Sequence, residues 1–107
     1  MQNRADGIVV DRYVFETLLR DLAGRDRSPA SYAVYLYLWC RSNAGDEAVS
    51  ASHQSISDET GLAKRTVQDA LRRLHRRGLV SSTRESMTAV PEYRIHRPWL
   101  RRQRSNA

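Results

Sequence analysis

The sequence predicts a mainly α-helical domain with a small β-hairpin. Two observations support the helices. Apolar residues recur at helical spacing on both sides of a glycine between residues 52 and 77, and residues 32–40 form an uncharged run behind a serine–proline pair. A third observation supports the hairpin, because two short runs with β-branched or aromatic residues, 79–84 and 92–96, follow the last helical stretch.

The length of the chain is that of one domain. Its 107 residues, of which 40% are hydrophobic, suffice for one modest core, and we expect no separate ligand-sensing domain. The expected organisation is a strand and helix extension over residues 1–27, a central domain over residues 28–97 and a basic tail over residues 98–107.

The N-terminal extension is expected to begin with a strand. Residues 8–10 are a β-branched run, Ile-Val-Val, and Asp11 after them can cap a helix. The apolar positions of that helix follow a helical stripe: Val14, Phe15, Leu18, Leu19 and Leu22. Gly24 and the charged residues 25–27 end the segment.

Residues 28–40 predict a helix that is buried on more than one side. Ser28 can cap it, and Pro29 is tolerated at the first helical position. Because residues 32–40 carry no charge, the helix must be covered by the N-terminal helix or a second subunit as well as by the helices after it. Cys40, the only cysteine, is expected to be buried and inert. A buried strand is the competing assignment, but the cap, the proline and the length favour a helix.

Residues 52–77 have the pattern of two helices joined by a tight turn. Ser52 can cap the first helix, over about residues 53–60, which puts Ile56 on its inner face. Gly61 can adopt the left-handed conformation that ends this helix, and Leu62 then anchors the turn in the core. From residue 64 a second helix has an apolar stripe: Val67, Ala70, Leu71 and Leu74.

Short strands are expected to complete the domain. Residues 48–50 can supply a first strand, Gly78 ends the second helix, and residues 85–91 form the tip of the hairpin between 79–84 and 92–96. In the tail, Trp99 and Leu100 either dock on the helical core or a subunit, or belong to a frayed, solvated end.

The outward face of the second helix is mostly basic and polar. It carries Lys64, Arg65, Gln68, Asp69, Arg72, Arg73 and Arg76. Residues 61–107 hold twelve basic and three acidic side chains in a chain of net charge +6. The major groove of DNA admits one helix, and arginine and glutamine can bond bidentately to guanine and adenine. Double-stranded DNA is therefore the expected partner of this face, and a solvated surface without a partner is the alternative interpretation.

A set of small, apolar and turn residues runs at fixed spacing from the first of these two helices into the hairpin. It comprises Ser52, Ile56, Ser57, Gly61, Ala63, Thr66, Val67, Ala70, Leu71, Leu74, Gly78, Leu79 and Val80. With this set, residues 49–96 resemble the winged helix-turn-helix domains of bacterial transcription regulators and of plasmid or phage replication proteins. Two positions depart from the common pattern. Ser57 replaces an alanine and is still small, and Ala63 replaces the serine cap of the second helix, a loss of about 1 kcal/mol.

The expected site follows from helix-turn-helix docking, in which the N-terminal part of the second helix reaches the base edges. We assign base reading to Lys64, Arg65, Gln68, Asp69 and Arg72. Phosphate contacts are assigned to Ser52, His53, Thr66, Arg73, Arg76, Arg84 and Arg94. The last two belong to the hairpin, the "wing", which in related domains lies along the phosphate backbone or enters the minor groove. Its tip has no lysine or arginine.

We expect a small transcription regulator that binds double-stranded DNA sequence-specifically as a homodimer. The dimer is inferred from the excess apolar surface of residues 13–40 and from the habit of the families that the chain resembles. Two alternatives stay open: a plasmid or phage replication or partition module, and a winged-helix module that binds an acidic protein.

Other classes of function lack support in the sequence. The three histidines have no partners at metal-ligand spacing, and there is no glycine-rich phosphate loop and no set of nucleophile, base and orienting residue. We expect no enzymatic activity, metal, cofactor or small-molecule ligand. No apolar stretch reaches membrane-spanning length and no signal pattern is present, so the expected location is the cytoplasm, in association with the bacterial nucleoid.

Overall fold

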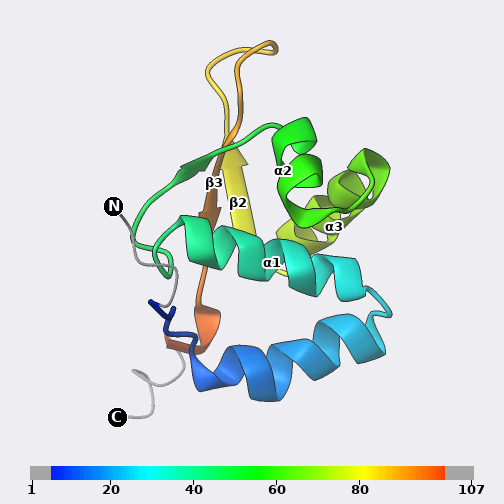
Figure 1. Cartoon of the computed structure of the whole chain (residues 1–107), viewed down its shortest axis with the longest axis vertical. Helices are drawn as coiled ribbons and strands as arrows, with labels where there is room; N and C mark the ends of the chain where they lie inside the picture. The colour runs from blue at the N-terminus through cyan, green and yellow to red at the C-terminus, as the bar shows by residue number, and fades with distance from the viewer. Residues whose placement is uncertain (1–5, 101–107) are drawn as a thin grey trace.

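The computed structural model describes residues 6–100, which form four helices and a three-stranded antiparallel sheet (Figure 1). The elements in chain order are η1 (Val14–Arg25), α1 (Pro29–Arg41), β1 (Val49–Ser50), α2 (His53–Thr60), α3 (Lys64–Arg76), β2 (Val80–Thr83) and β3 (Glu92–Ile95). The predicted class, mainly α-helical with a small hairpin, is confirmed. Residues 1–5 and 101–107 lie outside the described residues, and with them Arg101, Arg102 and Arg104 of the expected basic tail.

The helix η1 is wound more widely than an α-helix. At its end the backbone N–H of Asp26 donates to the carbonyl of Asp21 at 2.9 Å, which is the spacing of a π-helix. Its buried residues are Val14, Leu18 and Leu22. Phe15, expected in the buried stripe, is 68% exposed. The wider winding puts more residues into each turn, so the inward stripe follows a spacing of four and Phe15 turns outward.

The strand expected at residues 8–10 does not form. These residues belong to no helix or strand, and the carbonyl of Val9 accepts a hydrogen bond from the indole of Trp39 at 2.9 Å. The segment therefore crosses the end of α1 instead of joining the sheet, whose outer position beside β3 is occupied by β1.

The helix α1 is the centre of the core. The Ser28 hydroxyl caps it by accepting a hydrogen bond from the N–H of Ser31 at 3.2 Å. It packs against η1, α2, α3 and β3, which confirms that it is covered on more than one side. Its buried residues are Ser31, Val34, Tyr35, Leu38 and Trp39. The prediction of a buried Cys40 is wrong, because this residue lies one position beyond the buried stripe and is exposed.

The two helices α2 and α3 meet at the predicted turn. Ser52 caps α2 by accepting a hydrogen bond from the N–H of Ser55 at 3.0 Å, and Gly61 ends it with a φ of 79°. That left-handed conformation favours glycine. Leu62 packs on the core while staying partly exposed, and Ala63 gives α3 no side-chain cap. The predicted stripe of α3 is buried in full: Val67, Ala70, Leu71 and Leu74.

The sheet has the order β1-β3-β2, with Val49 opposite Tyr93 and Ser82 also opposite Tyr93 on the other side. Because side chains alternate along a strand, Ser82 and Tyr93 share the face that meets the helices. Ser81 and Arg94 are paired on the opposite face. The wing between β2 and β3 extends beyond the helices (Figure 1).

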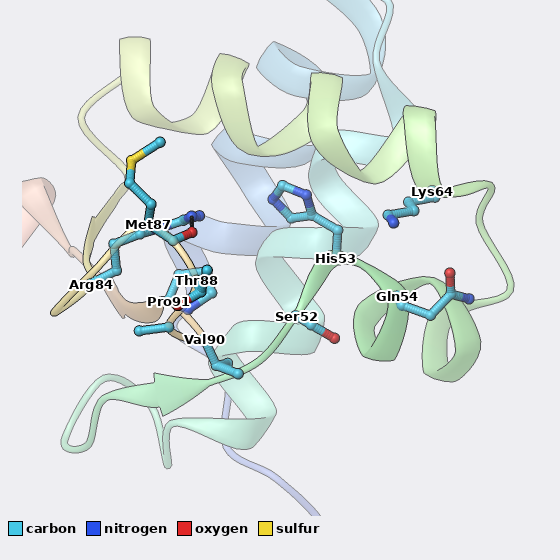
Figure 2. Close-up of a pocket in the computed structure, with 10 residues that line it drawn as sticks. Ser52, His53, Gln54, Lys64, Arg84, Met87, Thr88, Val90 and Pro91 are labelled. Carbon is cyan, nitrogen blue, oxygen red and sulfur yellow. Dashed lines mark hydrogen bonds between the residues drawn. The ribbon is translucent and has the colours of Figure 1, made fainter.

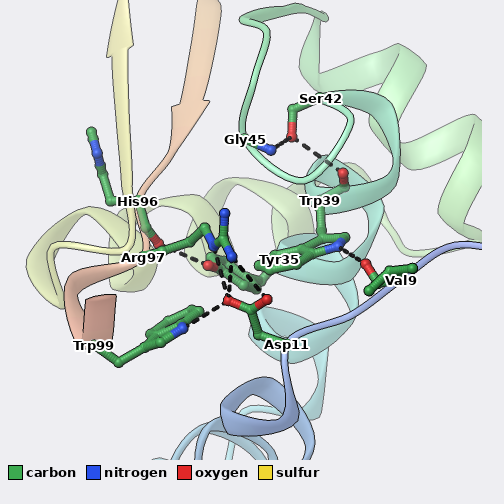
Figure 3. Close-up of polar contacts among 9 residues, drawn as sticks. All are labelled: Val9, Asp11, Tyr35, Trp39, Ser42, Gly45, His96, Arg97 and Trp99. Atoms are coloured by element: carbon green, nitrogen blue, oxygen red, sulfur yellow. Dashed lines mark hydrogen bonds and ion pairs between the residues drawn. The ribbon is translucent and has the colours of Figure 1, made fainter. Parts of the chain in front are cut away.

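The two ends of the described chain are joined by a polar and aromatic cluster, the terminal clasp, formed by Asp11, Arg97 and Trp99 (Figure 3). Arg97 donates to the Asp11 carboxylate through Nε at 2.9 Å and Nη2 at 2.7 Å, and the Trp99 indole donates to it at 2.8 Å. The Trp99 ring, 4% exposed, stacks on Tyr13 at a centroid distance of 4.6 Å. Of the two alternatives for Trp99, docking on the core is the one observed.

Candidate nucleic-acid interface

The outermost line of α3 is exposed and carries an acidic residue between two arginines. The side chains of Arg65 and Arg72 are 81% and 63% exposed. Asp69 forms ion pairs with both, at 3.6 Å to Arg65 and 3.2 Å to Arg72. These contacts at helical spacing align the two guanidinium groups along the helix, and Asp69 itself is occupied by them.

A groove lies between α3 and the wing. It consists of two hollows that share His53 and Arg84, and we call it the wing groove. The first hollow, of about 260 Å³, is shown in Figure 2 and is lined by Ser52, His53, Gln54, Lys64, Arg84 and residues 87–91. The second, of about 490 Å³, is lined by His53, Gln68, Leu71, Arg72, His75, Ser82, Arg84 and Tyr93.

The charge of the wing groove is of one sign. Its lining residues include the cations Lys64, Arg72 and Arg84 and no aspartate or glutamate. The Arg84 guanidinium donates to the carbonyl of Met87 at 3.2 Å, which holds it at the base of the wing. A concave surface lined by cations attracts a polyanion more strongly than isolated surface charges do.

His53 lies where the two hollows meet. Its Nδ1 is 3.3 Å from the Gln68 side-chain amide nitrogen, and Figure 2 shows its ring between Arg84 and Lys64. Partial burial, and then the charges of Lys64 and Arg84, lower the pKa of His53 from its ordinary value of 6.5. The imidazole is therefore neutral at pH 7.

The other flank of α3 faces η1 and carries its own carboxylate. Arg77 donates to Asp26 through Nε at 2.9 Å and Nη2 at 2.8 Å, and Arg73 pairs with the same carboxylate at 3.6 Å. The hydrogen bond from Arg77 is the main cause of the lowered pKa of Asp26. The structure thus separates Arg73, one of the expected phosphate contacts, from the wing groove.

Three other expected phosphate contacts are scattered. Thr66 is partly buried in the first turn of α3, and Arg76 is exposed in its last turn. Arg94 is exposed on the face of the sheet away from Tyr93, so it is not a lining residue of either hollow of the wing groove. The residues that the structure does bring together are Ser52, His53, Lys64, Gln68, Arg72 and Arg84.

Sequence reasoning missed several lining residues of the wing groove, among them Gln54, His75 and Tyr93. A signal existed for two of them. His75 follows Gln68 by seven positions, which is two helical turns, so the two side chains lie on the same side of α3. Tyr93 and Ile95 alternate with the charged Glu92 and Arg94, so they share one face of the strand. The place of Gln54 depends on how α2 meets the wing, which no local pattern predicts.

Among residues 6–100, no helix is long and apolar enough to cross a membrane. In the same part of the chain no three histidine, cysteine, aspartate or glutamate side chains are grouped so that they could hold a metal ion.

Comparison with solved structures gives a likeness in fold. The chain is similar to the structure of a point mutant of MepR from S. aureus, with a TM-score of 0.56 and 13% sequence identity over 91% of this chain and 74% of that one. No protein-family model matches the sequence, and no curated protein matches it either. At this level of identity the likeness concerns the fold alone. The chain thus has a winged-helix fold, which it shares with MepR.

Proposed function

We propose that the protein binds double-stranded DNA sequence-specifically and acts as a small transcription regulator in the bacterial nucleoid, with α3 inserted into the major groove. The observation that carries this proposal is the wing groove, a concave surface beside the exposed face of α3 that contains three cations and no carboxylate among its lining residues.

The proposed base-reading residues lie along the outer and wing-side faces of α3. Arg65, Gln68 and Arg72 span about two turns, a rise of roughly 10 Å. At about 3.4 Å for each base pair, this length corresponds to about three base pairs. Arginine suits guanine and glutamine suits adenine in the major groove. In this proposal Asp69 aligns Arg65 and Arg72 through its ion pairs instead of meeting a base.

The proposed phosphate contacts flank that line. Lys64, for which the sequence predicts base reading, lies across the first hollow from Arg84, with Ser52 and His53 between them at the start of α2. A phosphate seated there would meet two cations and the Ser52 hydroxyl. Arg76, exposed at the far end of α3, is placed for a second phosphate.

A homodimer is part of the proposal. Two copies would place two α3 helices in successive major grooves, about 34 Å apart. The apolar side chains of Ile8, Val9 and Phe15 support it, since they are exposed near the N-terminal end of the described chain. Burying them against a second copy would remove apolar surface from water.

The test is selection of bound fragments from the source organism's DNA at about 150 mM salt, where unspecific phosphate attraction is weakened. We expect enrichment of one motif, arranged as an inverted repeat near promoters. The double variant Arg65→Ala/Arg72→Ala should lose this enrichment. The matched control is Arg73→Ala/Arg94→Ala, which removes the same charge outside the wing groove and should keep it.

Three outcomes would count against the proposal. Direct repeats near an origin would favour a replication module. No enriched motif would contradict sequence-specific binding. Equal losses in the two double variants would show that net charge, and not the placement of residues on α3, determines binding.

A further inference from the structure

We propose that His53 is a positioning residue that sets the base preference of Gln68, by holding its carboxamide in the orientation that reads adenine. This inference rests on the proposed function. It assigns part of the sequence specificity to the hydrogen bond between His53 and Gln68 in the wing groove.

The geometry joins residues from two helices. His53 is the first residue of α2, and Gln68 lies in the second turn of α3. The Gln68 Nε2 atom is 3.3 Å from the His53 Nδ1 atom, in a partly buried contact. A neutral imidazole with its proton on Nε2 accepts at Nδ1, so the Gln68 amide is the donor. The contact therefore fixes which end of the carboxamide faces inward.

The fixed carboxamide has a defined outward pattern. One N–H is used by His53, which leaves the other N–H and the Oε1 atom for a base edge. Adenine presents an acceptor, N7, and a donor, the N6 amino group, to the major groove, and this pair matches an N–H beside an oxygen. With the carboxamide reversed, both N–H groups would face outward and would match the two acceptors of guanine, O6 and N7.

Protonation of His53 would cause that reversal. A protonated imidazole donates from both nitrogens, so Nδ1 could only meet the Gln68 oxygen. The charged and titratable groups that line the wing groove with His53 are all cationic or neutral: Lys64, Arg72 and His75 of α3, Arg84 of the wing and Tyr93 of β3. Partial burial, and then the charges of Lys64 and Arg84, oppose the charged form and lower the pKa of His53, which agrees with a neutral ring at pH 7.

The experiment measures a base preference at one position. The base pair read by Gln68 is identified as the one whose discrimination disappears in Gln68→Ala. Duplexes with adenine or guanine at that position then compete for binding at about pH 7.5 and about pH 5.5, on either side of the usual histidine range. The readout is the affinity for the adenine duplex divided by the affinity for the guanine duplex. This ratio is unaffected by the general rise in DNA affinity that protonation causes at low pH.

The wild-type protein should prefer adenine by about tenfold at the higher pH, and the preference should be smaller at the lower pH, where a larger fraction of His53 is protonated. In His53→Asn the amide oxygen takes the place of Nδ1 as an acceptor that does not titrate, so the preference should persist at both values. His53→Ala should show little preference at either. The control is His96→Ala, which removes an exposed histidine that lies outside the wing groove, bonded to Ser81 at 2.8 Å, and should behave as wild type.

Two results would overturn the inference. One is an adenine preference that survives in His53→Ala, and the other is a pH dependence that persists in His53→Asn. Both differ from a failure of the proposed function, in which the wild-type protein would show no preference among duplexes at any position.

Discussion

The two flanks of α3 are both rich in basic residues, yet they differ in what those residues meet. On the wing side Lys64, Arg72 and Arg84 line a groove with no carboxylate among its lining residues, and Arg72 pairs with the exposed Asp69 of α3 itself. On the η1 side Arg73 and Arg77 share the carboxylate of Asp26, which is 51 residues before Arg77 in the chain. The comparison teaches that arginines available for binding can be told apart from arginines in structural ion pairs only when the positions of acidic residues distant in the sequence are known.

The same division appears at the ends of the described chain. Arg97 belongs to the basic C-terminal half, but its guanidinium is bound to Asp11 and lies over the Trp39 ring at 5.3 Å from its centroid. The N-terminal segment thus supplies the carboxylates that occupy arginines away from the wing groove.

The largest effect is expected from breaking the terminal clasp. Arg97→Ala leaves the Asp11 carboxylate in a partly buried site without its guanidinium partner, with only the Trp99 indole still donating to it, so the free energy of unfolding should fall by about 2–3 kcal/mol. Urea unfolding measures this loss. The motif preferred by the folded protein should not change, and a changed motif would show that Arg97 also takes part in binding.

The next effect sharpens the contrast between the flanks. Arg65→Ala and Arg72→Ala should each weaken binding to the selected site by about ten- to a hundredfold. Their unfolding free energies should stay within about 0.5 kcal/mol of wild type, because both side chains are exposed. Arg73→Ala should weaken binding less than about threefold. A titration in which Arg73→Ala loses as much as Arg72→Ala would remove the distinction between the flanks.

A smaller effect concerns salt. If Arg84 meets a phosphate, Arg84→Ala should reduce the slope of log affinity against log salt by about 1, for all duplexes alike. The comparison variant is Arg94→Ala, which removes an arginine from the opposite face of the sheet and should keep the wild-type slope. Equal slopes for Arg84→Ala and wild type would mean that the base of the wing does not touch DNA.

The smallest effect concerns pH and the η1-side flank. The folded-state pKa of Asp26 is below its ordinary value of 3.8, so its ion pairs stabilise the fold above that value and cease to do so as the pH falls through the lowered pKa. Asp26→Asn should therefore lower the unfolding free energy at pH 7 by up to about 1 kcal/mol. The difference from wild type should vanish in acid, and a constant difference at every pH would contradict the assignment.

The helices and the sheet could be predicted because local signals agree with the tertiary structure. As predicted, Ser28 and Ser52 cap the N-terminal ends of α1 and α2, and Gly61 ends α2 in a left-handed conformation. The apolar stripe of α3 is buried, as its helical spacing predicts. Residues 8–10 show where local signals fail. Their β-branched composition predicts a strand, but Trp39 takes the Val9 carbonyl and β1 takes the position beside β3.

The candidate site could be predicted only in part. Helical spacing brings Lys64, Gln68 and Arg72 to one side of α3 as expected. The separation of Arg73 from that side depends on Asp26, and the separation of Arg94 depends on the register of β2 and β3. Both are contacts between distant parts of the sequence, which composition and periodicity do not encode.

The terminal clasp also has a consequence for the order in which the chain folds. Asp11 and Arg97 are 86 residues apart, so their contact closes nearly the whole chain into a loop and has a larger entropic cost than contacts between successive helices. We expect the helices around α1 to assemble first and the clasp to close after the folding barrier is crossed. The clasp would then slow unfolding without speeding folding, and so set how long each folded molecule survives.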